Sequence, residues 1–252
     1  MKKKYTLHAL AAIFLIGLGL GSQGCNQNQP ITTAVLAEPL PVTVVSNFSN
    51  ASLNVNPTLT NSKRGNFLDG TYGYTTDSGL ILSTPPAGDP SDSSYALHLF
   101  GTYTDYGNGA YPAFELECFL RDDQSYFDAS GFTGIKFDWN CPSDDNSQQR
   151  FLCLVTARIA PQSIGGDGTC GTAGAVPCYD YFSLTLPQTG GTWQSITASL
   201  MTGFPLQYSS GSPSTVQTTD LQQVLELMWT NRANNIAGNY TCNMWLDNIR
   251  FY

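Results

Sequence analysis

Residues 126–140 show the clearest alternation of apolar and polar positions in the chain. A stretch rich in Asp, Ser and Gly comes first, and then Ile135, Phe137 and Trp139 alternate with polar residues. Alternation with a period of two is typical of a half-buried β-strand, and the preceding residues are typical of a turn. The pattern therefore predicts a turn that leads into a strand at residues 135–140, with Trp139 on its buried face.

Similar patterns recur along the chain, whereas no long stretch has the period of a helix. We expect further strands at residues 42–48, 95–103, 114–120, 150–159, 181–186, 193–200, 225–229 and 244–251. One helical turn is expected at residues 221–224, where Thr219 and Asp220 can cap it. Many short strands in a chain of 252 residues favour an all-β fold, an antiparallel sandwich of two sheets in a single domain.

The N-terminal residues have the pattern of an export signal. Lys2, Lys3 and Lys4 precede an apolar run at residues 9–20, which is too short for a permanent membrane span but suits a signal peptide. Residues 22–25, Ser-Gln-Gly-Cys, resemble a bacterial lipobox, in which Cys25 would be lipidated and become the mature N-terminus. Ordinary cleavage after Ala37 is the alternative.

We therefore expect a signal peptide at residues 1–24, a flexible tether at 25–41 and the sandwich domain at 42–252. The tether is rich in Asn, Gln, Thr and Pro and has no periodicity. Lipidation at Cys25 would anchor the exported protein in a membrane of the bacterial cell envelope. The outer membrane or the cell surface is the expected location.

The cysteines suggest disulfides. The chain has seven of them, and if Cys25 takes lipid an even number remains in an oxidising compartment. The short spacing favours a pair between Cys170 and Cys178. The sequence leaves open how the other four pair. These are Cys118, Cys141, Cys153 and Cys242. The expected fold is thus a disulfide-stapled sandwich.

Charge and composition exclude several classes of function. The formal net charge is −8 and the basic residues of the mature chain are scattered singly, so a nucleic acid partner is excluded. After removal of the signal peptide His98 is the one remaining histidine, which excludes a zinc site of several histidines. No G-x-S-x-G motif is present, and the G-x-G-x-x-G at residues 166–171 lies in a Gly-rich loop without a βαβ context.

Four segments resemble strands of jelly-roll carbohydrate-binding modules, closest to family 11 and the wider galactose-binding-like group. They are YFDASGFTGIKFDW at residues 126–139, VVSNF at 44–48, TWQSI at 192–196 and WLDNIRF at 245–251. The resemblance implies a jelly roll that binds a polysaccharide or another glycan without catalysis and requires no cofactor. It also implies a structural calcium ion near the first and last strands, for which Asn47 and Asp247 would supply oxygens. The alternative is that Asp247 only bonds at a strand edge.

Sugars stack their C–H faces on aromatic rings and bond their hydroxyls to carboxylates, amides and guanidinium groups. Tyrosines at expected strand ends and loops are therefore candidate ligand-binding residues, and polar residues of the strand faces complete the set. The candidates are Tyr103, Tyr106, Tyr111, Tyr179 and Tyr181, together with Glu117, Asp138, Arg158 and Glu226. His98 is expected on the same strand face as Phe100, opposite to Leu97 and Leu99. Ordinary solvent-facing positions are the alternative for all of these residues.

Two other functions remain open. Glu115 and Glu117 lie two apart on one strand face, and Glu226 or Asp138 could join them, as the paired carboxylates of a glycoside hydrolase would require. A structural or protein-interaction lipoprotein with the same sandwich, and without sugar binding, is the remaining alternative.

Overall fold

The computed structural model describes residues 43–49, 51–54, 66–69, 75–91, 94–109, 112–121, 126–142, 147–155, 181–200, 216–234 and 236–252. These residues all belong to one compact unit, Pro39–Tyr252. The expected signal peptide, the tether and Cys25 lie outside the described residues, as do Cys170 and Cys178. No helix among the described residues is long and apolar enough to cross a membrane.

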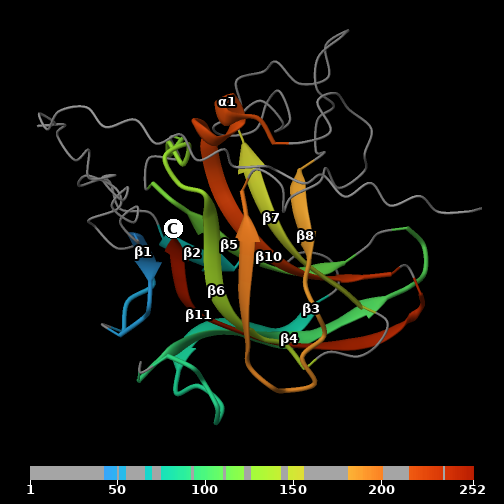
Figure 1. The fold of residues 1–252 in the computed structure, drawn as a ribbon. Helices are drawn as coiled ribbons and strands as arrows, with labels where there is room; N and C mark the ends of the chain where they lie inside the picture. The colour runs from blue at the N-terminus through green and yellow to red at the C-terminus, as the bar shows by residue number, and fades with distance from the viewer. Residues whose placement is uncertain are drawn as a thin grey trace, which may run out of the picture. The chain divides into compact units, whose positions relative to one another are not determined.

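The described strands form two antiparallel sheets (Figure 1). Sheet A has the order β3 (Thr75–Ser83), β4 (Ala96–Asp105), β11 (Gly238–Phe251), β6 (Gly134–Asn140) and β9 (Gln194–Ser199), and β1 (Thr43–Ser46) also pairs with β11. Sheet B has the order β2 (Asn66–Asp69), β5 (Ala113–Phe119), β10 (Val224–Ala233), β7 (Ser147–Val155) and β8 (Phe182–Thr185). The prediction of an all-β sandwich is confirmed.

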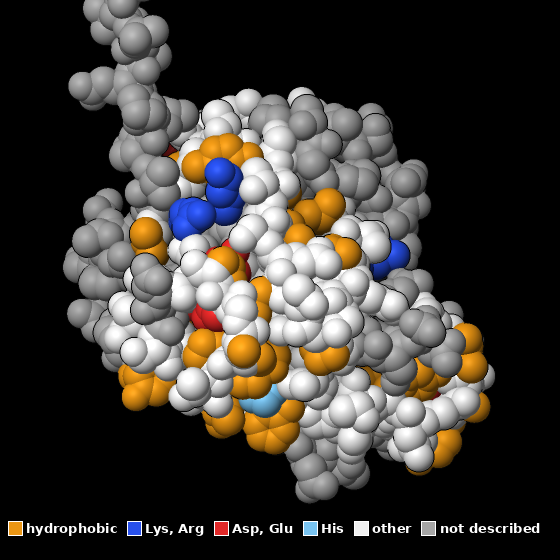
Figure 2. All heavy atoms as spheres, turned by 60° about the horizontal axis from the view of Figure 1, so that its bottom comes forward, with side chains coloured by type: hydrophobic (Ala, Val, Ile, Leu, Met, Phe, Trp, Pro, Cys, Tyr) orange, Lys and Arg blue, Asp and Glu red, His pale blue; other side chains and the backbone are white. Residues whose placement is uncertain are grey.

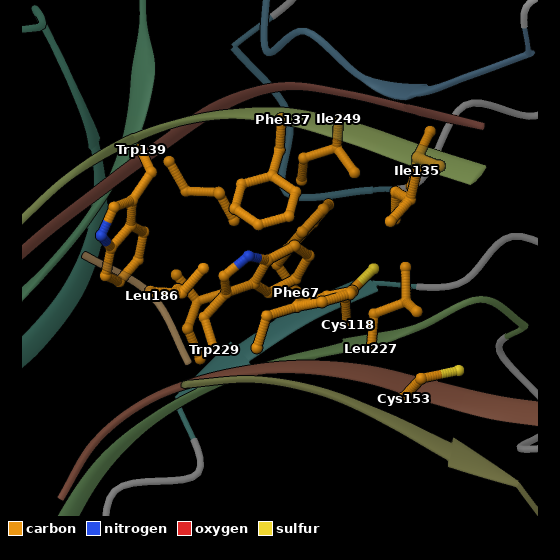
Figure 3. Close-up of a cluster of buried hydrophobic side chains, with 14 of the residues drawn as sticks. Phe67, Cys118, Ile135, Phe137, Trp139, Cys153, Leu186, Leu227, Trp229 and Ile249 are labelled. Atoms are coloured by element: carbon orange, nitrogen blue, oxygen red, sulfur yellow. The ribbon is translucent and has the colours of Figure 1, made fainter. Parts of the chain in front are cut away.

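The inner faces of the two sheets share one apolar core. On β6, Ile135, Phe137 and Trp139 are buried as their alternation predicts. Phe137 meets Trp229 of sheet B edge to face, with ring centroids 5.5 Å apart, and Phe151 of the same sheet at 5.1 Å. Figure 3 shows side chains from both layers, among them Phe137 and Trp229, pointing toward one another. Burial of such rings provides most of the free energy that holds the two sheets together.

The structure differs from the predicted elements in several places; β11, for example, begins at Gly238, six residues before the expected start at residue 244. Strand β10 extends to Ala233, four residues beyond the expected end at Trp229. The helical turn α1 (Thr218–Leu221) begins three residues earlier than predicted, because Gln217 is its N-cap and donates its backbone N–H to the Asp220 carboxylate at 2.9 Å.

The disulfide prediction requires correction for the described cysteines, all of which are buried thiols in the structure. Cys118 on β5 and Cys153 on β7 both face Leu227 of β10 from opposite sides. Two strand spacings separate their Cα atoms by roughly 9–10 Å, which is beyond the limit of about 7 Å for a disulfide.

The other two described cysteines contact polar groups of the core. The Cys242 thiol donates to the carbonyl of Leu99 at 3.7 Å, and the Cys141 sulfur accepts the amide of Asn231 at 3.8 Å. An even number of cysteines therefore says nothing about pairing when each side chain occupies a separate core position.

We expect the thiols of Cys118 and Cys153 to resist iodoacetamide in the native protein at pH 8 and to react completely after unfolding without reductant. Burial blocks access and raises the pKa of the Cys118 thiol, and it raises the pKa of the Cys153 thiol to about 12, so almost no thiolate is present. Mass spectrometry of the digested protein measures the labelling. A peptide in which either residue is linked through a disulfide would contradict the assignment.

Candidate functional site

Three glutamates gather on the outer face of sheet B. In β5 the buried Phe114, Leu116 and Cys118 point into the core, which places Glu115 and Glu117 on the opposite face, as predicted. The neighbouring β10 sets Met228 against Glu117 and Thr230 against Glu115. Glu226 precedes Met228 by two positions, so its side chain lies on the same outer face. We call the surface formed by Glu115, Glu117, Glu226, Met228 and Thr230 the carboxylate face.

These carboxyl groups influence each other's protonation. Burial, then the charge of Glu117, raises the pKa of Glu115 to about 8, although Arg232 acts in the opposite direction. Burial, then the charges of Glu117 and Glu115, raises the pKa of Glu226 well above its usual range. Burial and the nearby Asp69 raise the pKa of Glu117 as well. With a pKa of about 8, Glu115 keeps its proton at neutral pH, and the same burial and like charges disfavour the ionised form of Glu226.

Glu226 is the most deeply buried of the three. It is 4% exposed, and its Oε1 atom has no hydrogen-bond partner in the described part of the chain. An unsatisfied buried polar atom costs about 1–3 kcal/mol. Because this oxygen is covered by other atoms, a ligand meets the carboxylate face at the partly exposed Glu115 and Glu117, whose carboxyl groups can accept hydrogen bonds, or donate them when protonated.

An apolar cluster adjoins the glutamates on the same face. Leu152 and Leu154 of β7 pack with Met228, and Tyr181 packs against this cluster. Because Met228 lies between Glu117 and Leu152 across the sheet, the apolar and acidic parts share one surface. Apolar contacts beside a few convergent polar groups are typical of small-molecule sites.

Two arginines lie beside the carboxylate face. Arg150 lies opposite Thr230, and Arg232 lies two positions beyond Thr230 on β10. Sequence analysis missed Thr230 and Arg232, because the expected strand ended at Trp229. The alternation of residues 226–232, with Glu, Met, Thr and Arg at every second position, was the signal that could have found them.

The structure brings together Glu117, Glu226 and Tyr181 of the predicted ligand-binding set. Tyr106 lies apart in the loop after β4 and is 56% exposed. The remaining tyrosines Tyr111 and Tyr179, together with Arg158, lie outside the described residues.

Two predicted site residues require correction. Tyr103 is 1% exposed and stacks on Tyr240 at 5.1 Å in the core, because β4 continues to Asp105 and keeps this ring on the inner face. Asp138 is 3% exposed on sheet A, where it accepts hydrogen bonds from Ser195 at 2.5 Å and Asn248 at 2.9 Å. Neither residue can contact a ligand on the carboxylate face.

The calcium ligands implied by the resemblance do not form a site among the described residues. The Asn47 side-chain oxygen accepts the hydroxyl of Ser49 at 2.9 Å, and Asp247 accepts the backbone N–H of Asn248 at 2.6 Å and the hydroxyl of Ser91. In the described part of the chain, no group of three or more His, Cys, Asp or Glu side chains is placed to hold a metal ion. Asp247 is fully buried in β11, which lies between β4 and β6 in sheet A, so the alternative role at a strand edge is wrong as well.

No family model and no curated protein matches the sequence. Among solved structures, the chain is similar to a family 11 carbohydrate-binding module of a cellulosomal cellulase of Clostridium thermocellum, with 12% identity, a TM-score of 0.49 and coverage of 84% of this chain and 95% of that chain. It is also similar to a family 27 module of Caldicellulosiruptor saccharolyticus in complex with mannohexaose, with 12% identity, a TM-score of 0.42 and coverage of 84% and 97%.

An exo-beta-agarase is a third similar structure, with 16% identity and a TM-score of 0.45, covering 83% of this chain but 24% of that chain.

We expect Glu115→Gln to flatten the fall of the unfolding free energy between pH 5 and pH 9, and to stabilise the protein at the alkaline end. The Glu115 pKa of about 8 in the folded protein lies above its ordinary value of 4.5, so the folded state keeps a proton that the unfolded chain has released. Wild-type stability therefore falls as pH rises through this interval. Urea titrations at several pH values measure the effect.

The matched control is Asp128→Asn, because hydrogen bonds from Ser130 lower the pKa of this exposed carboxyl group and it stays ionised above pH 5. This control should shift the stability curve without changing its slope. Parallel curves for wild type and Glu115→Gln would contradict the burial of Glu115.

Proposed function

We propose that the carboxylate face binds a neutral carbohydrate and that this chain is a non-catalytic carbohydrate-binding protein of the bacterial cell envelope. The supporting observation is that the partly exposed Glu115 and Glu117 lie on one face with the apolar cluster of Tyr181, beside the buried Glu226. A ligand there must offer hydroxyl groups and an apolar face together. A pyranose ring does both.

The protonation of the carboxyl groups determines which carbohydrates the carboxylate face can bind. Carboxyl groups that keep their protons donate and accept hydrogen bonds, as sugar hydroxyls do, and they add no charge. A uronic acid or a sulfated sugar would bring its own negative charge to a face where burial and neighbouring carboxyl groups already disfavour ionisation, so a neutral sugar fits better. The C–H face of a neutral sugar would lie on Tyr181 and Met228, with Arg150 and Arg232 as further donors.

The location in the envelope is part of the proposal. It rests on the charged and apolar N-terminal segments and on the lipobox-like residues before Cys25. A lipid on Cys25, followed by the tether at residues 25–41, would hold the domain at a distance from the membrane, where it could meet a polysaccharide.

We expect Tyr181→Ala to weaken binding of neutral oligosaccharides about tenfold, which corresponds to the ~1–1.5 kcal/mol of one aromatic contact. A glycan array identifies the ligand, and calorimetry with that ligand measures the affinity. Tyr106→Ala is the matched control, because this exposed tyrosine lies outside the carboxylate face. Equal losses in both variants, or no binding to any glycan, would favour the structural lipoprotein instead.

A glycoside hydrolase is the second candidate, because three carboxyl groups with raised pKas lie on one face. Interaction between them separates their titrations, so one can hold a proton as an acid while its neighbour is ionised. The Cα atoms of Glu115 and Glu117 lie about 6.6–6.8 Å apart along β5. From this spacing their carboxyl groups can reach the separation that either hydrolytic mechanism requires.

We expect no sustained release of reducing ends when the wild-type protein is incubated with soluble polysaccharides, since the proposed role is binding. Reducing-sugar assays over several hours measure this. Continuous turnover that falls at least about a hundredfold in Glu117→Gln would establish the hydrolase and reject the non-catalytic role. Tyr106→Ala should leave any such turnover unchanged, which separates a catalytic loss from a general effect of substitution.

A further inference from the structure

A second surface with the properties of a ligand site lies on the outer face of sheet A. It is built from three cross-strand pairs of β4 and β11, which are His98 with Trp245, Phe100 with Asn243 and Thr102 with Thr241. All of these residues except Trp245 line a shallow pocket, to which Gly101 and Cys242 also contribute. We call these six residues the aromatic patch. In Figure 2 a histidine side chain lies at the surface among hydrophobic side chains.

The rings of the aromatic patch are fixed in place. The imidazole of His98 stacks on Trp245 with centroids 3.7 Å apart and planes 8° apart, and Phe100 lies 4.9 Å from His98. Phe100 faces Gly79 of β3, where an added Cβ atom would lie 3.1 Å from the tip of the ring. The ring therefore occupies the space that a side chain at position 79 would need, so the patch is a preformed aromatic surface.

Asn243 is fixed as well, and its orientation follows from the chemistry of its partners. The Trp245 indole N–H, which can only donate, lies 3.0 Å from the Asn243 Oδ1 atom, so the atom there is the amide oxygen. The His98 Nε2 atom lies 2.7 Å from the same oxygen and therefore holds the hydrogen. In the neutral imidazole the Nδ1 atom then has the lone pair and can accept.

The pocket is polar at its edge and uncharged. The Asn243 amide nitrogen makes no hydrogen bond to the described residues, so its two hydrogens are available to a ligand. Burial lowers the pKa of His98, which keeps the ring neutral at pH 7. The Thr241 hydroxyl is exposed at the rim.

We propose that the aromatic patch is a second carbohydrate contact, which holds a neutral pyranose ring against Phe100 and His98 and bonds its hydroxyls to Asn243 and Thr241. The proposal extends the proposed function, since it assumes that the protein binds carbohydrate. An uncharged lining excludes ionic ligands, and fixed rings beside a fixed donor and acceptor match a ligand with one C–H face and peripheral hydroxyls.

Two contacts on opposite outer faces would make the domain bivalent. The carboxylate face and the aromatic patch belong to different sheets and are separated by the core. One domain could then hold two chains of a polysaccharide, or two segments of one chain, and so increase its avidity without tighter contacts at either site.

The test uses the ¹⁵N-labelled protein and three probes, cellohexaose, mannohexaose and agarohexaose, each titrated to millimolar concentration. The chain has four tryptophans, and the indole N–H signal of Trp245 reports on the patch because this group bonds to Asn243. We expect at least one probe to shift that signal. Thr241→Arg, at an exposed position, should fill the pocket and weaken the response at least about tenfold. Thr197→Arg, exposed on β9 of the same sheet face, is the matched control and should leave it unchanged.

Tyr181→Ala separates the two proposals. A Trp245 shift that Thr241→Arg abolishes and Tyr181→Ala preserves would establish the second contact. Calorimetric binding that Tyr181→Ala weakens, without any shift at Trp245, would overturn the second contact and leave the carboxylate face as the site. The absence of both responses to all three probes would reject both proposals.

Discussion

The contact of Trp229 with Phe137 and Phe151 is the interaction on which the two outer faces depend. It joins β10 and β7 of sheet B to β6 of sheet A, with ring centroids 4.9–5.5 Å apart. Strand side chains alternate, so fixing these three rings inward also fixes which residues point outward. A slip of one residue in β10 would turn Glu226 into the core and expose Trp229. The geometry of the proposed site is thus set by apolar packing on the other side of the same strands.

The sequence could predict the local part of this arrangement. The alternation in β6 and β5 was sufficient to place Trp139 in the core and Glu115 and Glu117 outside it. It could not show that β10 lies between β5 and β7, because these pairings join residues about 70–120 positions apart in the chain. The same limit explains the wrong disulfide prediction. The sequence left a pair between Cys118 and Cys153 open, and only the strand pairing shows that β10 lies between them.

Errors at single residues had local causes. Tyr103 was expected at the exposed end of a strand, although it continues the inward series that Leu97 and Leu99 begin, and it is buried because β4 continues to Asp105. The side chain of Asp138 points away from the core as predicted, but it is buried all the same. Neighbouring side chains on sheet A cover it, and alternation along one strand contains no information about what packs above the sheet.

The acid pair Asp138 and Asp247 of sheet A differs from the glutamates of sheet B in whether the carboxylate oxygens are satisfied. On sheet A, Asp138 and Asp247 face each other across β6 and β11, and each of their four oxygens accepts a hydrogen bond, from Ser195, Asn248 or Ser91. Donors of this kind stabilise buried carboxylates without a ligand.

On sheet B, the glutamates have like charges as neighbours and Glu226 has an oxygen without a described donor. A folded chain gains nothing from that arrangement by itself, because desolvation and mutual repulsion both raise its free energy. Glu226 itself is covered by other atoms, whereas Glu115 and Glu117 are partly exposed. Bound hydroxyl groups would therefore contact the carboxylate face at Glu115 and Glu117, where new hydrogen bonds lower the free energy of a face that the fold alone leaves repulsive.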